Sequence, residues 1–206
     1  MMQLNPAVVS LQHLPDLSGF TRGAVLPANE YDAVARLPAG WSTAMAVSQH
    51  DPAMRVVTDF QLEQPATVSG NQLIDDALSG MQAAGVQSLL VVEDEAVIGL
   101  ITAQDIRGER PTLFLHETGQ LQSRGIRVRD IMTAWEDAQT LDLKRLRAAR
   151  VADVVRFFAA TRATHVLVVE YPEHGDVIVR GLLSRSRVER LVGQPIPAPG
   201  RRGLSG

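Results

Sequence analysis

Residues 85–106 read GVQSLLVVEDEAVIGLITAQDI, and residues 162–188 read RATHVLVVEYPEHGDVIVRGLLSRSRV. Both stretches contain a short apolar strand that ends in Val-Val-Glu, then a turn, a second apolar strand, and a step from glycine through two apolar residues to a hydroxyl side chain. The second copy differs mainly by a longer turn, residues 171–176. Because an internal repeat fixes the architectural unit, the chain is predicted to contain two copies of one small fold.

Each copy is preceded by a predicted helix. Ser69 or Asn71 is the candidate N-cap of the first helix, and Gly85 is the glycine that ends it. Residues 143–160 predict the second helix, which has the same periodicity. The apolar face comprises Leu73, Ile74, Ala77, Leu78, Met81 and Ala84 in the first helix, and Val151, Val154, Val155 and Phe158 in the second.

The residues that lead into these helices complete the repeat. Val56 and Val57 predict a short strand, residues 67–68 predict an extended pair, and the sequence IRVRDIMT opens the second copy at Ile126. Each repeat is therefore predicted as strand, helix, strand, strand, helix, an α+β unit with a three-stranded sheet that carries its two helices on one face. The open face needs a cover, and the two repeats are predicted to pack about a pseudo-twofold axis.

Composition along the chain divides it into five segments. Proline and glycine interrupt every periodic pattern in residues 1–52, which are predicted to be a Pro/Gly-rich N-terminal extension. The first repeat is predicted at residues 53–110, a linker at 111–125, the second repeat at 126–192 and a disordered tail at 193–206.

Overall composition argues against several classes of protein. The net charge of −3 disfavours a nucleic-acid-binding protein, and the absence of cysteine excludes disulfides and thiolate metal sites. The apolar runs are too short to cross a membrane, and the N-terminus lacks the features of a signal peptide, so a cytoplasmic protein is expected. Lys144 is the only lysine among twenty basic residues, and this arginine bias suggests a bacterial genome rich in GC.

The order of elements, together with IRVRDIMT, the Val-Val-Glu strands and the segments GLITAQD and GLLSRSR, resembles the CBS domain. Two such domains in tandem form a Bateman module, and the resemblance covers about residues 54–192. It implies a regulatory module that binds an adenine nucleotide (AMP, ADP or ATP) in the cleft between the two repeats. It also implies that two modules pair as a homodimer.

The resemblance implies a ligand site at the step from strand to helix in each repeat. In the family a Thr or Ser hydroxyl contacts phosphate or ribose, and an Asp three residues later binds the ribose diol, a pattern that Thr102 and Asp105 fit. A carboxylate offers paired acceptors to adjacent hydroxyls, and the junction offers free backbone N–H groups to phosphate. In the second copy Ser184 keeps the hydroxyl, but Arg187 replaces the Asp and is expected to pair with phosphate or to fill the pocket.

The resemblance also implies that residues at the start of the second strand of each repeat line the pocket. These are Ser88 and Leu89 in the first copy, and His165 and Val166 in the second. His165 is the candidate partner for phosphate, and Ser88 is its weaker counterpart.

Each candidate also has a purely structural interpretation. Thr102 and Asp105 have the spacing of a capping box, which needs no ligand. Ser184 can serve as a simple N-cap, and His165 as a solvent-facing or hydrogen-bonded residue of a strand. The sequence alone leaves these alternatives open.

The sequence lacks the P-loop, nucleophile-elbow and zinc-protease signatures, and its histidines lack the spacing of metal ligands. The expected function is therefore non-catalytic: a sensor of an adenine nucleotide that needs no cofactor or metal and signals by conformational or dimer rearrangement to an unidentified protein effector. The alternative is a structural or interaction CBS dimer that binds no nucleotide because its own side chains fill the pockets.

Overall fold

The computed structural model describes residues 47–119, 125–174 and 176–199. They form two compact units. The first unit holds the described residues from 64 to 138, and the second holds most of the remainder, including residues 47–63, 139–171 and 179–199. Each unit contains one mixed β-sheet and its own helices, so the predicted α+β class is confirmed.

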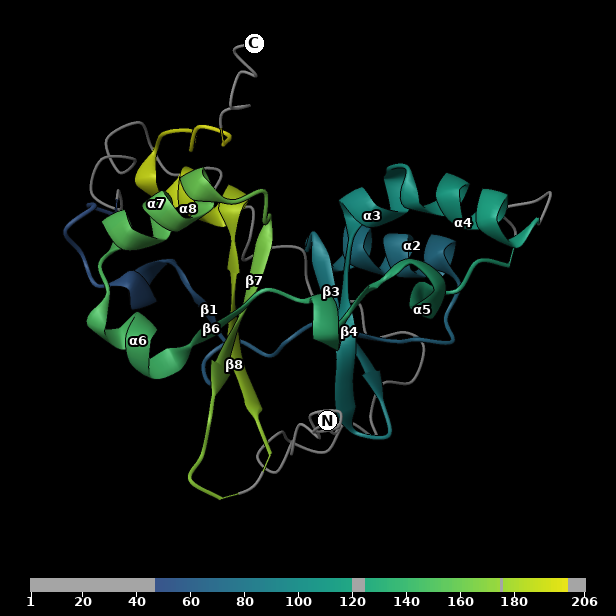
Figure 1. Cartoon of the computed structure of the whole chain (residues 1–206), viewed down its shortest axis with the longest axis horizontal. Helices are drawn as coiled ribbons and strands as arrows, with labels where there is room; N and C mark the ends of the chain where they lie inside the picture. Colours follow the sequence, from purple (N-terminus) through teal and green to yellow (C-terminus); the bar gives the residue numbers. More distant parts are fainter. Residues whose placement is uncertain (1–46, 120–124, 175, 200–206) are drawn as a thin grey trace, which may run out of the picture. The chain divides into compact units, whose positions relative to one another are not determined.

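The first unit is built on a four-stranded sheet in the order β2-β3-β4-β5. Strands β2 and β3 are parallel, and the other two pairs are antiparallel. Helices α2 and α3 pack on one face of the sheet, where the core of this unit lies (Figure 1). The elements are β2 (Thr67–Ser69), α2 (Ile74–Ala84), β3 (Ser88–Glu93), β4 (Ala96–Thr102), α3 (Ala103–Arg107), α4 (Arg110–Thr118), α5 (Val128–Ile131), β5 (Thr133–Ala134) and the 3₁₀ helix η3 (Trp135–Asp137).

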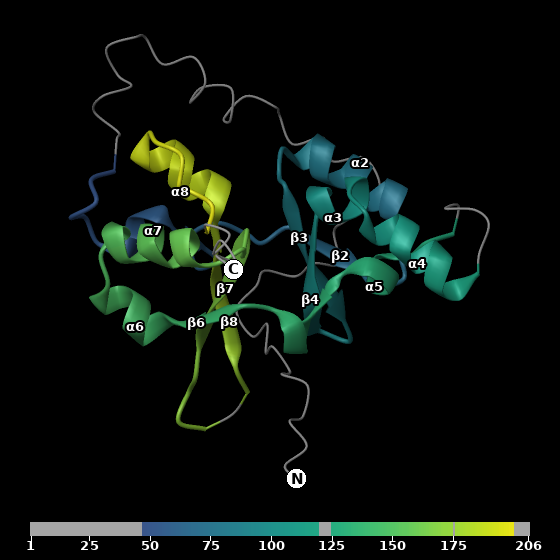
Figure 2. The same cartoon turned by 45° about the horizontal axis from the view of Figure 1, so that its top comes forward.

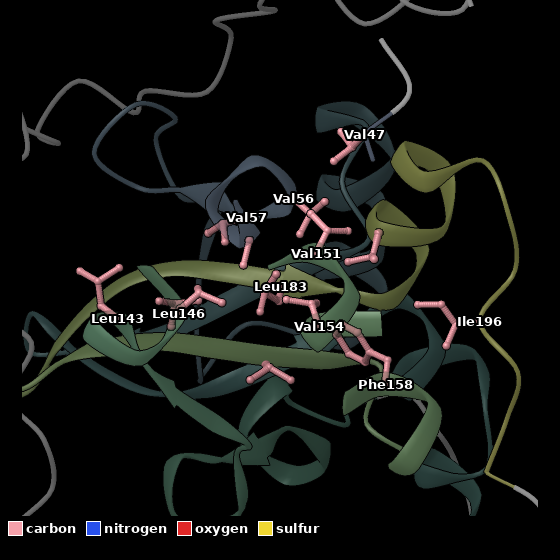
Figure 3. Packing of buried hydrophobic residues seen from close by; sticks show 14 residues of the cluster. Val47, Val56, Val57, Leu143, Leu146, Val151, Val154, Phe158, Leu183 and Ile196 are labelled. Carbon is pink, nitrogen blue, oxygen red and sulfur yellow. The ribbon is translucent and has the colours of Figure 1, made fainter. Parts of the chain in front are cut away.

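The second unit repeats this plan with a sheet in the order β1-β8-β7-β6. Strands β6, β7 and β8 are labelled in Figure 2. Its core joins α7 to the sheet through Val154, Phe158 and Leu183, and Ile196 closes one end (Figure 3). Phe158 is fully buried, as its place on the predicted apolar face requires. The elements are the 3₁₀ helix η2 (Ala53–Val56), β1 (Thr58–Asp59), β6 (Thr140–Asp142), α6 (Leu143–Ala148), α7 (Val151–Ala160), β7 (His165–Glu170), β8 (Ile178–Ser184) and α8 (Arg185–Val192).

The two repeats exchange the segments that lead into them. The first lead segment, residues 52–59, supplies β1 to the sheet of the second repeat, where Thr58 pairs with Leu182. The second lead segment, residues 126–134, supplies β5 to the sheet of the first repeat, where Thr133 pairs with Leu100. The prediction of three-stranded sheets is therefore wrong, because the fourth strand of each sheet has only two residues and comes from the other repeat.

A glycine lies opposite each exchanged strand: Gly99 of β4 faces β5, and Gly181 of β8 faces β1. A Cβ atom on Gly99 would lie 2.4 Å from the carbonyl oxygen of Thr133, and one on Gly181 would lie 2.6 Å from the carbonyl oxygen of Thr58. Neither distance leaves room for a side chain. The glycine that both copies share is thus a requirement of the strand exchange.

The start of α2 differs from the prediction. Its N-cap is Leu73, and neither Ser69 nor Asn71 caps it. Ser69 instead accepts a hydrogen bond from the backbone N–H of Asn71 at 3.3 Å, in a local turn. Leu73 forms an isolated β-bridge with Arg127 of the second lead segment, and the N–H of Ile74 donates to the carbonyl of Ile126 at 3.1 Å, so this segment satisfies one free N–H group at the start of the helix. Gly85 does end the helix, with φ +66°, as predicted.

The single helix predicted at residues 143–160 is wrong. The chain forms two helices, α6 and α7, separated by extended backbone at Ala149 and Arg150. Ala149 accepts a hydrogen bond from the N–H of Ala53 at 3.0 Å, and Arg150 forms a β-bridge with Pro52. The first lead segment therefore breaks this helix at a point where the sequence contains neither proline nor glycine.

Three shorter segments also behave differently from their sequence patterns. Val56 lies in η2 and Val57 directly after it, so the strand predicted there is wrong, although both side chains are buried. The predicted linker begins within a helix, α4, whose Phe114 packs against the first core. In the segment predicted as a tail, Ile196 is buried, while residues 200–206 lie outside the described part of the chain, as do residues 1–46 of the extension.

The turn between β3 and β4 contains backbone strain that a single substitution can relieve. Asp94 and Glu95 form its two-residue turn and have φ values of 46° and 64°, in the left-handed region. Asp tolerates this region better than Glu, which lacks a short polar side chain that can bond locally. Glu95→Gly is therefore expected to raise the free energy of unfolding by about 0.5–1 kcal/mol.

Thermal melting of the variant checks this expectation, with an increase of roughly 2–3 °C for a chain of this size. Glu117→Gly is the matched control, because Glu117 lies in α4 at helical φ and the same change there should lower the melting temperature. A change in melting temperature in the same direction for both variants would contradict the strain argument.

Candidate functional site

The step from β4 to α3 holds the first candidate pair. Thr102 is the N-cap of α3, and Asp105 is its third helical residue. The Thr102 hydroxyl accepts from the N–H of Asp105 at 3.1 Å, and Asp105 Oδ2 accepts from the N–H of Thr102 at 2.9 Å. The Thr102 hydroxyl also donates to Asp105 Oδ2 at 2.8 Å. The capping box is thus present, as one of the two sequence interpretations requires.

The second oxygen of Asp105 pairs with Arg110, which is not one of the predicted site residues. Arg110 Nε lies 3.1 Å from Asp105 Oδ1. A carboxylate has about four acceptor positions, of which the two bonds on Oδ2 and this ion pair use three. One acceptor position therefore remains on Oδ1. The Asp105 side chain is 15% exposed, so the carboxylate is largely but not fully covered.

Ser88 and Leu89 begin the strand beside this junction. Ser88 is the cross-strand partner of Thr102, and the N–H of Ala103 donates to the carbonyl of Gln87 at 2.9 Å. Ser88 is half-buried, whereas Leu89 is 5% exposed and belongs to the core of the first unit. The structure therefore brings Ser88 next to the Thr102–Asp105 pair and uses Leu89 as core.

The second repeat has the same junction with different chemistry. Ser184 caps α8 and accepts from the N–H of Arg187 at 3.1 Å, and its hydroxyl lies 3.3 Å from that of Ser186. His165 begins β7, with Nδ1 3.0 Å from the hydroxyl of Thr164. Val166 is 1% exposed and lies in the second core, as Leu89 does in the first.

Arg187, which stands where the first repeat has Asp105, forms an ion pair with Glu63. Arg187 Nη2 lies 3.3 Å from Glu63 Oε1, and the two side chains are 25% and 43% exposed. The Nε atom of Arg187 is buried and has no hydrogen-bond partner among the described residues. One carboxylate thus satisfies only part of a guanidinium that can bind two oxygens at once.

The predicted site residues therefore fall into two groups, one in each unit. Thr102, Asp105 and Ser88 come together in the first unit, and Ser184, Arg187 and His165 occupy the corresponding positions in the second. Sequence reasoning missed Arg110 and Glu63. Both lie outside the repeated motifs, in connecting segments, and no spacing rule links them to their partners.

Among the described residues, no group of three or more His, Asp or Glu side chains is placed to hold a metal ion. Of the helices that the structure describes, none combines the length and the apolar character needed to cross a membrane.

The family model for the CBS domain matches residues 57–111. This range runs from the first lead segment through α3 into α4, and the second unit repeats the same order of strands and helices. The match identifies a CBS domain in residues 57–111 and confirms the resemblance found in the sequence.

Several solved structures are similar to this chain. CBSX2 in complex with AMP is 23% identical, with a TM-score of 0.48 over 68% of this chain and 94% of that chain. The CBS-pair protein CBSX2 from Arabidopsis thaliana is 21% identical, with a TM-score of 0.46 over 69% and 94% of the two chains. A conserved CBS domain protein of unknown function from Thermoplasma acidophilum is 18% identical, with a TM-score of 0.46 over 65% and 68%. No curated protein matches the chain in sequence.

Proposed function

We propose that this CBS domain pair is a non-catalytic regulatory module that binds an adenine nucleotide, AMP, ADP or ATP, at the junction of Thr102 and Asp105. The observation that supports it most is the state of Asp105, whose partly exposed carboxylate keeps one acceptor position at a strand-to-helix step. Ribose hydroxyls are donors that suit this acceptor. Ser88, across the strand from Thr102, offers a hydroxyl to the phosphate.

Binding is proposed to signal by favouring one arrangement of the repeats, or of two protomers in a homodimer, which a separate protein effector recognises. A ligand shifts such an equilibrium only as far as its affinities for the two arrangements differ. In the second repeat, Arg187 and His165 are proposed to meet phosphate, because the carboxylate that would bind a ribose diol is absent there. The module needs no cofactor or metal for this role.

Nucleotide addition is expected to raise the melting temperature of the purified chain. At a ligand concentration near 100 times the dissociation constant, a one-site ligand stabilises the folded state by about 2.7 kcal/mol. For a chain of this size the shift should be roughly 5–10 °C. Differential scanning fluorimetry with AMP, ADP and ATP measures it, with AMP tested first, and mass spectrometry of small molecules released from the purified protein shows any nucleotide that it retains.

Asp105→Ala should abolish this shift, because it removes the diol acceptor. It also removes half of the capping box, which by itself lowers the melting temperature of the unliganded protein. Asp153→Ala is the matched control: Asp153 accepts from the N–H of Arg150 at 2.8 Å at the start of α7, outside the candidate site. That bond, and next the side chain of Arg156, lower the pKa of the Asp153 carboxyl below its usual value.

The control should therefore lose folded-state stability but keep the full nucleotide shift. Melting curves that stay unchanged with all three nucleotides at millimolar concentration would reject the proposed function.

The second candidate function is a structural or interaction module without nucleotide. The two ion pairs favour this function, because side chains of the protein itself, Glu63 and Arg110, already bind Arg187 and Asp105 at the two junctions. The same titration decides between the two functions, since a module filled by its own side chains gains no stability from any adenine nucleotide.

A further inference from the structure

Arg110 contacts three groups that belong to different parts of the first unit. Its Nε pairs with Asp105 Oδ1 at 3.1 Å, at the start of α3. Its Nη1 donates to the carbonyl of Ile131 at 2.8 Å, and its Nη2 donates to the hydroxyl of Thr133 at 3.0 Å. The planar guanidinium presents its donors in a fixed fork, so these three contacts depend on one another.

The contacts of Arg110 with Ile131 and Thr133 hold the second lead segment. Ile131 is the last residue of α5, where carbonyl groups lack helical partners, and Thr133 begins β5. Strand β5 pairs with β4 through only two residues, so each additional bond to it matters. Residues 135–139 then lead directly from β5 to β6, which belongs to the sheet of the second unit.

A ribose diol that binds Asp105 disturbs this network, because the carboxylate has too few acceptor positions left for both hydroxyls. A ribose diol donates two hydrogen bonds, whereas Asp105 has about one acceptor position left. The bonds on Oδ2 come from Thr102, which is buried, whereas the guanidinium of Arg110 is on a side chain that is 42% exposed. The ion pair is therefore the contact that yields to the diol.

We propose that Arg110 is a positioning residue that couples ligand binding at Asp105 to strand β5, and through β5 to the peptide that enters the second sheet. When a diol occupies Asp105, Arg110 releases its hold on β5. This inference depends on the proposed function for the identity of the ligand. The coupling between Asp105 and β5 does not depend on it, because the contacts exist in the protein alone.

Hydrogen–deuterium exchange of the whole chain tests the coupling without ligand. In Asp105→Asn the carboxylate charge that holds Arg110 is lost, and the backbone amides of β5 should exchange at least about threefold faster. Arg110→Met should produce the same acceleration. Arg107→Met is the matched control, because Arg107 is an exposed arginine of α3 outside this network and its loss should leave β5 unchanged.

The ligand experiment uses AMP as the probe. In the wild-type chain AMP should slow exchange in β3 and β4 while it accelerates exchange in β5, a combination that simple stabilisation does not produce. Arg110→Lys keeps a positive charge near Asp105 but cannot reach three acceptors at once. It should bind AMP within about threefold of the wild-type affinity and lose the acceleration in β5.

The outcomes separate the two proposals. If AMP binds but β5 exchanges at the same rate in the wild-type chain, Asp105→Asn and Arg110→Met, the coupling is wrong and the proposed function stands. If AMP does not bind but Asp105→Asn and Arg110→Met both accelerate β5, the coupling stands and the proposed ligand is wrong. Circular dichroism confirms that each variant is folded before it is compared.

Discussion

Gly99→Ala is expected to destabilise the protein by about 2–3 kcal/mol, in the upper part of the range for overpacked sites. The new Cβ would lie 2.4 Å from the carbonyl oxygen of Thr133, which is backbone and cannot rotate away as a side chain can. Either β5 moves off the sheet or β4 bends. The melting temperature should fall by roughly 5–10 °C.

Gly181→Ala should have a similar effect, because its Cβ would meet the carbonyl oxygen of Thr58 at 2.6 Å. The matched control is Gly80→Ala. Gly80 lies inside α2 with no neighbouring atom within 4 Å of the new methyl group, so the same change there should raise the melting temperature. Melting of Gly99→Ala at the wild-type temperature would show that the exchanged strand does not pass over Gly99.

Arg185→Met is the second change with a large expected effect. The guanidinium donates to the backbone carbonyls of Phe158 and Thr161 at the C-terminal end of α7, and to the carbonyl of Ile196 at 3.2 Å. It also lies 5.6 Å from the centre of the Phe158 ring. The last carbonyls of a helix have no partners within it, so Arg185 acts as a cap from a neighbouring helix.

Methionine keeps the aliphatic packing of Arg185 but removes all three hydrogen bonds. Because charged hydrogen bonds contribute more than neutral ones, the free energy of unfolding should fall by about 2–4 kcal/mol. Chemical denaturation followed by circular dichroism measures this loss. Arg190→Met, at an exposed position of the same helix, should change it by less than about 0.5 kcal/mol. Equal losses in the two variants would contradict the capping role.

The sequence was sufficient to predict the repeated β-α-β-β-α unit because its signals are local. The strands β3 and β7 have continuous apolar runs, β4 and β8 repeat the step from glycine to a hydroxyl residue, and Gly85 ends α2 where the periodic pattern stops. Two errors share one non-local cause. The N-caps of α2 and α7, Leu73 and Arg150, both form β-bridges with a lead segment of the other repeat. Backbone pairing between distant residues leaves no periodic signal, so neither the cap nor the helix break could be read from the chain.

The candidate site was predictable to a similar extent. The capping box of Thr102 and Asp105 follows from the spacing of hydroxyl and carboxylate, and the structure contains it. The ion pairs of Asp105 with Arg110 and of Arg187 with Glu63 do not follow from any motif, because they depend on where connecting segments return to the junctions. These two pairs use part of the hydrogen-bonding capacity of Asp105 and of Arg187.

The exchange of lead segments has a consequence for how the chain acquires its structure. Strand β1 is synthesised before every other strand of its sheet, and its partner β8 is synthesised after all of them. Strands this far apart in the sequence pair slowly, because closing the long loop between them costs conformational entropy before their contacts form. Severing the polypeptide between the repeats would leave each half one strand short, so neither half is expected to fold as an autonomous domain.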